Sequence, residues 1–545
     1  MIKFRAKLIY LFAFLLLSAF YLVTAPENRI EVDDAFWFAA HVRDLSLVQL
    51  LRPRYLLFLP INSLIYKVFI SMGVPILSYA LMSLVSMISA VLTLLLFARL
   101  LQRSFAVSPL GSAVAAGLLS VTYGFWRYAV EAEVYATAML LTIGSFSLVA
   151  WSCEENQEQG PWRAAIAGVL SGAAVLFYQP NLIPLFLALP VLYLRKKHLP
   201  LLVSYLTVAA VIILGGYAAA YLAVRPPALS FLDFVLSAVP AQVNANPIKI
   251  LFAFGSNILS ANWIFGFDAV SRFLETAFPN QVIVEEVYAA KTAGFLRLVP
   301  LLTLPAIVIT LLSLILVLRR FRTFASPSRE LLAVLIWLAI YIPILYKGSP
   351  TAPEAWIMIL MPLMILIACY LVEPCLQLGR VRLLVAFTVL VMLHNLIGGI
   401  GIIHSRDGDY YAVKAQWVLK NTTTADALLT GGSIPFTCYL SYFAPARVVN
   451  VVWMSTQVSS AVERVHRNGG NVFALDDAFN PPSGMKSDYP QAYALVKRLL
   501  SSVEADAIKV FESPVGDTFR IVFEPLVLRE TVTNHGSREI GACLW

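Results

Sequence analysis

Two adjacent carboxylates, Asp33 and Asp34, follow shortly after the first apolar segment of the chain. Charged side chains beside a bilayer carry an energetic cost, so acids in this position suggest a function. A carboxylate can serve as a general base by accepting the proton of an attacking hydroxyl group. The alternative interpretation is a solvated loop that contains two acids.

The segment before these acids indicates on which side of a membrane they lie. Residues 8–23 are apolar and follow Lys3, Arg5 and Lys7. Cations flank membrane spans on the cytoplasmic side, which places the N-terminus inside and the acids outside. The apolar stretch exceeds the usual core of a signal peptide, so we expect a retained anchor.

A second candidate group occupies residues 125–135, which read FWRYAVEAEVY. Tryptophan and tyrosine are typical of the membrane interface, but this preference does not explain Arg127, Glu131 and Glu133. If the segment is helical, residues two apart point in different directions, and only one glutamate needs to face an interior cavity. Tyr135 begins the apolar run that follows.

Further candidates lie in two other loops. Arg52 and Arg54 stand in the first loop, next to an aromatic and apolar stretch interrupted by prolines. Glu354 and Trp356 stand just before another apolar run. Glu354 also has a purely structural interpretation, because an acid near a helix N-terminus interacts favourably with the helix dipole.

The composition is that of a membrane protein. Of 545 residues, 59% are hydrophobic and 13% charged, and the mean hydropathy is +0.77, whereas soluble proteins carry roughly 25% charged residues. The net charge of +8 comes from cations at the ends of apolar runs. We therefore attribute it to membrane orientation and expect no nucleic-acid partner. The histidines and cysteines form no metal motif, which leaves open whether a divalent metal takes part.

A helix needs about 20 apolar residues to span a bilayer. The sequence predicts about eleven spans, at 7–24, 75–98, 106–123, 134–152, 163–178, 180–194, 200–223, 297–318, 331–346, 355–373 and 383–403. With a cytoplasmic N-terminus, this alternation places the basic clusters inside and the C-terminus outside. The predicted transmembrane module therefore covers 1–403, with large external loops at 25–74 and 225–296.

The composition becomes that of a soluble protein after His404. Short apolar runs alternate with helical patterns, which predicts that 404–545 forms an external α/β domain, periplasmic or equivalent, with a parallel sheet. Residues 431–433 (GGS) follow a predicted strand, where a tight turn is favoured over an anion site. Asp476 and Asp477 end another predicted strand, and solvated loop acids are the favoured interpretation there.

Residues 125–136 resemble the "FW…AVEAEVYA" segment of a polytopic family that was once labelled only as of unknown function. That family includes the animal transmembrane protein O-mannosyltransferase and belongs to the GT-C glycosyltransferases. Residues 353–356 (PEAW) are similar to the family's "NPEYW"-like loop, and Asp33 with residues 38–40 resembles its acidic "D..EF.AA" stretch. The resemblance covers the chain to about residue 400.

The resemblance implies a GT-C-like polytopic fold and a mannosyltransferase-like enzyme. Its donor would be a polyprenyl-phosphate sugar in the bilayer, and its acceptor a hydroxyl group of a protein or glycan. Asp33 or Asp34 would be the base of an inverting transfer, and Arg52, Arg54 or Arg127 would stabilise the leaving phosphate. The other predicted substrate-binding residues are Glu131, Glu133, Tyr135, Glu354 and Trp356.

Two alternatives remain at this point. A transporter or flippase of lipid-linked sugar is disfavoured, because the chain shows no internal repeat and no acid in the middle of a span. The motifs do not exclude a degenerate member that binds a sugar-linked lipid without catalysis.

Overall fold

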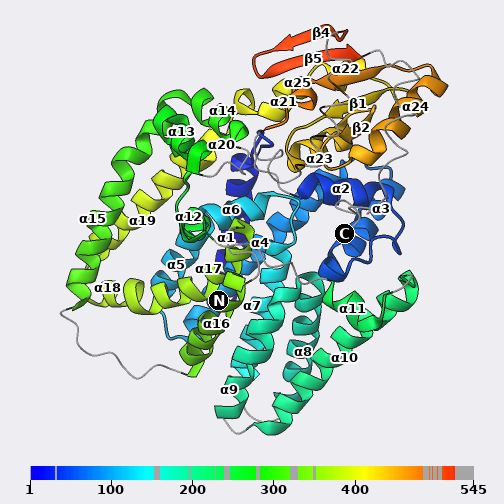
Figure 1. The fold of residues 1–545 in the computed structure, drawn as a ribbon. Coiled ribbons are helices and arrows are strands. Elements are labelled where there is room, and N and C mark those ends of the chain that lie inside the picture. Colours follow the sequence, from blue (N-terminus) through cyan, green and yellow to red (C-terminus); the bar gives the residue numbers. More distant parts are fainter. Residues whose placement is uncertain are drawn as a thin grey trace. The chain divides into compact units, whose positions relative to one another are not determined.

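The structure is a computed structural model that describes residues 2–30, 34–152, 160–195, 198–226, 229–237, 246–277, 283–319, 329–347, 352–482, 490, 494, 497, 500 and 506–521. It is mostly helical, with one small sheet near the C-terminal end (Figure 1). Asp33 lies outside the described residues.

Seven helical segments in the described part of the chain are long and apolar enough to cross a membrane. They are Ser78–Ser104, Tyr135–Ser152, Gly160–Phe177, Leu199–Val224, Gly294–Leu318, Pro353–Gln377 and Val381–His404. Each coincides with one predicted span. The remaining four predicted spans coincide with shorter apolar helices of 10–17 residues. The multi-pass helical architecture is therefore confirmed, and the number of eleven spans stays a prediction.

The helices of the first half of the chain begin and end as follows: α1 (Ile2–Thr24), α2 (Ala35–Asp44), η1 (Pro53–Tyr55), α3 (Phe58–Ser71), α4 (Ser78–Ser104), α5 (Pro109–Val121), α6 (Tyr123–Val130), α7 (Tyr135–Ser152), α8 (Gly160–Phe177), η3 (Gln179–Asn181), η4 (Pro184–Ala188), α9 (Pro190–Arg195), α10 (Leu199–Val224), α11 (Phe231–Leu236), α12 (Pro247–Ile258) and η5 (Asn262–Gly266). The first predicted external loop thus contains α2, η1 and α3. The second contains α11, α12 and η5, followed by α13 (Asp268–Ala277) and α14 (Val284–Thr292).

The helices of the second half are α13 (Asp268–Ala277), α14 (Val284–Thr292), η6 (Gly294–Leu298), α15 (Val299–Arg319), α16 (Arg329–Lys347), α17 (Pro353–Ile367), η7 (Ala368–Val372), α18 (Glu373–Gln377), α19 (Val381–Asn395), η8 (Leu396–Ile400), α20 (Gly401–His404), η9 (Arg406–Gly408), α21 (Tyr410–Ala415), α22 (Val418–Asn421), α23 (Ile434–Phe443), η10 (Ser455–Gln457), α24 (Val458–Asn468) and α25 (Asp476–Phe479). Helix α17 begins with Pro353, whose missing N–H has no intrahelical partner to lose at the first position of a helix.

Helices α4, α7, α8 and α10 lie side by side (Figure 1). Small residues allow α8 and α10 to approach closely, because a Cβ at Gly168 would lie 2.6 Å from the Tyr205 carbonyl oxygen. The Tyr205 hydroxyl lies 2.8 Å from Ser171 Oγ and donates to the Leu185 carbonyl at 2.6 Å. Small residues and interhelical hydrogen bonds are the usual means of packing helices in a bilayer.

The chain forms two compact units, each assembled from separate segments. The first contains residues 1–25, 41–261 and 298–400, and the second contains residues 26–40, 262–297 and 401–545. The predicted boundary between residues 403 and 404 stays a prediction, since compactness alone does not define a domain that folds independently.

The second unit contains a five-stranded sheet of order β2-β1-β3-β5-β4. Its strands are β1 (Ala427–Thr430), β2 (Arg447–Asn450), β3 (Val472–Leu475), β4 (Ile508–Ser513) and β5 (Gly516–Ile521). Strand β1 pairs in parallel with β2 and β3, whereas β5 pairs antiparallel with β3 and β4. The α/β domain is confirmed, but the prediction of a purely parallel sheet is wrong, because a tight hairpin at Gly516 (φ 141°) joins the last two strands.

The core of this domain lies between the parallel strands and α24. Alternate residues of β1 and β3 and one face of α24 are fully buried, among them Leu429, Ala474, Ala461 and Val462. The carboxyl ends of β1 and β3 carry the polar residues described below.

Candidate functional site

Helix α6 and the residues after it carry three of the predicted site residues in the first unit. All eight residues of α6 are buried, and the exposed fractions of Arg127, Glu131 and Glu133 are 9%, 1% and 3%. Arg127 Nε lies 3.5 Å from Glu131 Oε1. The structure therefore brings a predicted phosphate-binding cation and a predicted substrate-binding acid together as a buried ion pair.

The two glutamates lie in a non-helical link between α6 and α7. Glu131 is extended (φ −101°, ψ 160°) and ends α6, and Ser86 Oγ donates to the Glu133 carbonyl at 3.0 Å. The glutamates therefore do not lie on a helix, so the condition considered in the sequence analysis does not apply. Glu133 N donates to the Glu131 carbonyl at 2.9 Å, and both glutamates are buried in this turn.

Tyr135 lies in an aromatic cluster at the start of α7. Its ring centroid is 4.9 Å from that of Tyr128 and 5.2 Å from that of Tyr178. Tyr135 is within electrostatic range of Glu133 and Glu354. These interactions join the 125–135 segment to the start of α17.

The arginine loop reaches the same cluster. Arg54 lies over the Tyr55 ring, 5.3 Å from its centroid, and is within electrostatic range of Tyr178. The Tyr217 hydroxyl donates to the Pro53 carbonyl at 3.0 Å, which fixes the turn between the two arginines. Arg52 is half-buried on this turn. Sequence reasoning missed Tyr178, because nothing in its neighbourhood of the sequence distinguishes it from an interfacial tyrosine.

Asn257 links the start of α17 to α6. Its Nδ2 donates to the Pro353 and Ala253 carbonyl oxygens, both at 2.8 Å, and its side chain lies against Gly124, where a Cβ would overlap the carboxamide. Trp356 is buried in the first turns of α17, and its ring lies 5.4 Å from that of Phe254 on α12. Sequence reasoning missed Asn257, because its partners are far away in the chain.

Asp34 belongs to the second unit. It is exposed and directly precedes α2, and its carbonyl oxygen accepts from Phe38 N at 2.9 Å in the first turn of that helix. An exposed carboxylate at the start of an ordered helix is accessible to a substrate and has a defined backbone.

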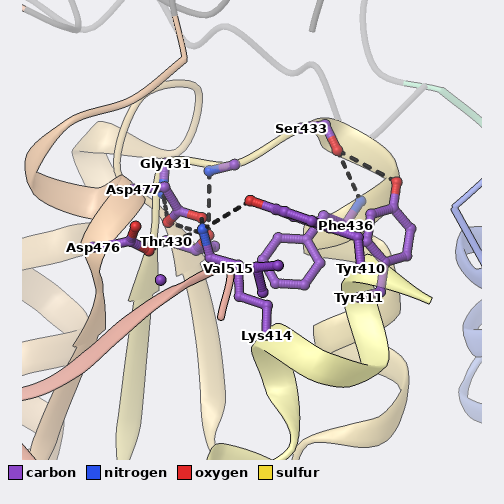
Figure 2. Close-up of polar contacts among 12 residues, drawn as sticks. Tyr410, Tyr411, Lys414, Thr430, Gly431, Ser433, Phe436, Asp476, Asp477 and Val515 are labelled. Carbon is purple, nitrogen blue, oxygen red and sulfur yellow. Dashed lines mark hydrogen bonds and ion pairs between the residues drawn. The ribbon is translucent and has the colours of Figure 1, made fainter. Parts of the chain in front are cut away.

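A second polar cluster lies at the carboxyl ends of β1 and β3 (Figure 2). Lys414 Nζ is 2.6 Å from Asp477 Oδ2 and 2.9 Å from Asp476 Oδ1. Asp477 Oδ1 accepts from Thr430 Oγ1 at 2.8 Å and from Gly431 N at 2.9 Å. The chain's own carboxylate therefore takes the place of an external anion, in agreement with the tight-turn interpretation.

The interpretation of the two aspartates as solvated acids is wrong for Asp477, whose side chain is 7% exposed. Burial lowers the pKa of Lys414, but the carboxylates, above all that of Asp477, outweigh burial and raise the pKa above its usual range. These ion pairs and hydrogen bonds thus connect α21 to the carboxyl ends of β1 and β3.

Glu285 on α14 lies in a buried hydrogen-bonded group beside this cluster. Ser433 Oγ donates to Glu285 Oε1 at 2.6 Å, and the Tyr411 hydroxyl donates to Oε2 at 2.7 Å. Ser433 also caps α23 by accepting from Phe436 N at 3.2 Å (Figure 2). Burial raises the pKa of Glu285 to about 7, although both hydrogen bonds and Lys414 oppose the rise.

No group of three or more potential metal-binding side chains occurs in the ranges that the structure describes. The polar side chains that the structure brings together in the two units include carboxylates, arginines and tyrosines. In the first unit they form a buried arginine–glutamate pair and a tyrosine cluster, and the second unit contributes an exposed acid.

Comparison with known proteins gives one family match and several similar structures. Residues 52–200 match the family model described as the N-terminal domain of the protein O-mannosyl-transferase TMEM260. ArnT from Cupriavidus metallidurans bound to undecaprenyl phosphate aligns with a TM-score of 0.57 and 11% identity, over 95% of this chain and 98% of ArnT. Apo ArnT from the same organism aligns with a TM-score of 0.57 and 12% identity, over 97% and 99% of the two chains. No curated protein matches significantly.

The matched range 52–200 includes the arginine loop and the whole 125–135 segment, which carried the resemblance in the sequence. At these identities the ArnT alignment establishes the fold. The chain is thus a multi-pass membrane protein with an ArnT-like, GT-C-like fold, and over residues 52–200 it is similar to the N-terminal domain of the protein O-mannosyl-transferase TMEM260.

Proposed function

We propose that this protein is a glycosyltransferase that moves a sugar from a polyprenyl-phosphate donor to an acceptor hydroxyl at the external membrane face. The observation that carries the proposal is the ArnT-like fold over 95% of the chain, in a neighbour whose structure holds undecaprenyl phosphate. The family match at 52–200 favours mannose as the sugar and a protein hydroxyl as the acceptor, with a glycan as the second choice.

The transfer is a single displacement. The acceptor oxygen attacks the anomeric carbon, the bond from that carbon to the phosphate oxygen breaks, and polyprenyl phosphate leaves with the electron pair. A carboxylate accepts the acceptor proton, and this is the role of Asp34 or its neighbour Asp33. Attack opposite the leaving group inverts the anomeric centre.

The leaving phosphate gains negative charge during the transfer and needs cations. Arg54 lies beside Tyr178, and Arg127 is buried next to Glu131. A preorganised guanidinium in a water-poor site stabilises developing charge more strongly than one in water. Arg52, Arg54 and Arg127 are therefore the proposed phosphate partners, and Glu133, Tyr135, Glu354 and Trp356 the proposed sugar contacts.

The test uses the purified full-length protein in detergent with a polyprenyl-phosphate mannose and a hydroxyl-bearing peptide. The rate of polyprenyl phosphate release is measured for the wild type, Asp33→Asn, Asp34→Asn and the double variant. Loss of a general base should lower turnover by about a hundredfold or more. Parallel reactions with a chelator determine whether a divalent metal takes part.

Asp44→Asn is the matched control, because Asp44 ends the helix that Asp34 precedes and forms an exposed pair with Arg43 at 2.8 Å. It should keep wild-type turnover. Full turnover in the Asp33/Asp34 double variant would place the base elsewhere, and absence of any sugar release by the wild type would refute the glycosyltransferase assignment.

A further inference from the structure

The segment on either side of Asp34 is held by residues that lie far along the chain in the same compact unit. Residues 26–40 group with 262–297 and 401–545. Asp34 itself is exposed, whereas Asn28, Ile30 and Phe36 around it are buried, with exposed fractions of 2%, 5% and 0%. An exposed acid between buried anchors is the arrangement expected of a group that must be both accessible and fixed.

The anchor before the acid is polar. Asn28 Nδ2 donates to the Gly408 carbonyl at 2.8 Å, and Asn28 N donates to the Ile403 carbonyl at 3.3 Å. Asn28 Oδ1 in turn accepts from Ile30 N at 3.0 Å. The Ile30 carbonyl oxygen lies 3.4 Å from the hydroxyl of Tyr411, which is fully buried.

The anchor after the acid is aromatic. The ring centroid of Phe36 lies 5.3 Å from that of Tyr439, 5.6 Å from that of Tyr442 and 5.4 Å from that of Phe443. These three rings project from α23, which directly follows β1 of the α/β domain. Pairs of aromatic rings at such distances stabilise one another beyond the effect of their buried area.

Tyr411 connects the two anchors. Its ring centroid lies 5.6 Å from that of Tyr439 and 5.1 Å from that of Phe436 on α23, and its hydroxyl donates to Glu285. These contacts form a continuous series from Ile30 through Tyr411 and Tyr439 to Phe36. They therefore connect the anchor before Asp34 to the anchor after it.

We propose that the C-terminal α/β domain acts as a holder for the acidic segment, with Tyr411, Tyr439 and Phe443 as positioning residues that fix Phe36 and thereby Asp34. This inference rests on the proposed function, in which that segment supplies the base. It assigns to the domain a role in placing the base in addition to any contact with the acceptor. A reacting group displaced by about 1 Å can lose about a hundredfold in rate, so loosening the holder lowers turnover while donor binding stays intact.

Phe443→Ala is the test variant, because Phe443 contacts Phe36 but is 36% exposed, so its removal leaves the fold intact. Ile434→Ala is the matched control, because Ile434 begins the same helix and is 38% exposed. Two quantities are measured on the full chain in detergent: hydrogen–deuterium exchange of the peptide 26–40, and kcat and KM for the lipid-linked sugar.

Phe443→Ala should speed exchange in 26–40 and lower kcat about tenfold or more, with KM for the donor unchanged within twofold. Phe443→Leu, which restores an apolar side chain against Phe36, should recover most of the slow exchange in 26–40 and most of kcat. Ile434→Ala should match the wild type in both measurements. Tyr411→Phe, which keeps the ring and removes the hydroxyl, should show a smaller effect in the same direction.

If Phe443→Ala leaves hydrogen exchange in 26–40 unchanged, α23 does not hold this segment. If exchange becomes faster but kcat stays at the wild-type value, the segment is held by α23 but this contact does not position the base. Failure of the proposed function has a different signature, namely no turnover by the wild type or full turnover by the Asp33/Asp34 double variant. The exchange measurement then decides by itself whether α23 holds the segment.

Discussion

Buried charges distinguish this chain from an ordinary bundle of apolar helices. Arg127 and Glu131 form a pair that is almost completely removed from solvent. Burying two charges costs several kcal/mol per ion, so such a pair adds little net stability compared with apolar side chains of the same size. Its presence at the end of α6 is therefore better explained by the chemistry of a site than by stability of the fold.

Glu285 gives the second unit a pH dependence near neutrality. Its pKa is raised from 4.5 to about 7 by burial, against the opposing effects of Ser433, Tyr411 and Lys414. Below pH 4.5 the carboxyl is protonated in both folded and unfolded chains, and its contribution to stability is complete. As the pH rises from 4.5 through 7, the unfolded chain loses the proton first, so that contribution is lost.

We therefore expect the melting temperature of the full chain in detergent to fall between pH 5 and pH 8, and Glu285→Gln to flatten this fall. Asp409, whose pKa burial raises to about 6, acts in the same direction and leaves part of the slope. Glu463→Gln, on the exposed face of α24, should leave the slope unchanged. If the melting temperature of Glu285→Gln falls with pH as steeply as that of the wild type, this carboxyl does not titrate near neutrality.

At the scale of elements, close packing at Gly124 holds α6, α12 and the start of α17 together. A Cβ at this position would overlap the Asn257 carboxamide, whose Nδ2 binds the Pro353 carbonyl. Gly124→Ala should therefore move α17 relative to α6 and lower both turnover and stability, because overpacking costs about 1–3 kcal/mol. Turnover and thermal unfolding measure the two effects.

Gly117→Ala is the matched control, because Gly117 lies in the preceding helix α5 and its Cβ would meet no atom within 4 Å. In an Asn257→Ala background, Gly124→Ala should cause a smaller further loss, because the carboxamide is gone and only the Cβ at position 257 remains close, at 2.9 Å. A further loss of the same size in that background would show that Gly124 acts through other contacts.

The elements differ in how well the sequence predicts them, for physical reasons. A membrane span is a local property of about 20 apolar residues, so all seven long spans were predicted. Strands β1 and β3 were predicted as well, because their apolar runs are short and bounded by turns. The turn at 131–134 was not, since tertiary contacts such as that of Ser86 determine its shape.

Four predicted site residues of the first unit lie near one another, because Arg54 and Glu354 are within electrostatic range of Tyr178, and Glu133 and Glu354 are within electrostatic range of Tyr135. What the sequence could not reveal were the residues that join them. Nothing in the sequence distinguishes Asn257 and Tyr178 from other asparagines and tyrosines. Their roles follow only from partners that lie about 100 residues away or more. The anchoring of Phe36 on α23 escaped prediction for the same reason.

At the scale of the whole molecule, the charge bias of the loops predicts a single orientation in the membrane. We expect an impermeant thiol reagent to label Glu512→Cys, whose side chain is 77% exposed on β4, in intact cells. Gln377→Cys, which is exposed between two predicted spans, should be labelled only after permeabilisation. The unsubstituted protein measures background labelling, and the reverse pattern would place the proposed base on the wrong side of the membrane.

The second unit also has a consequence for how the protein is made. Asn28 is synthesised 380 residues before its partner Gly408. At ribosomal rates of about 5–20 residues per second, roughly 20–80 s separate the two. During that interval the nascent acidic segment has already been translated, while the helix and sheet that anchor it do not yet exist. In the proposed function, the base is therefore positioned only after residues 408–443 have been synthesised, and shorter nascent chains do not consume lipid-linked sugar.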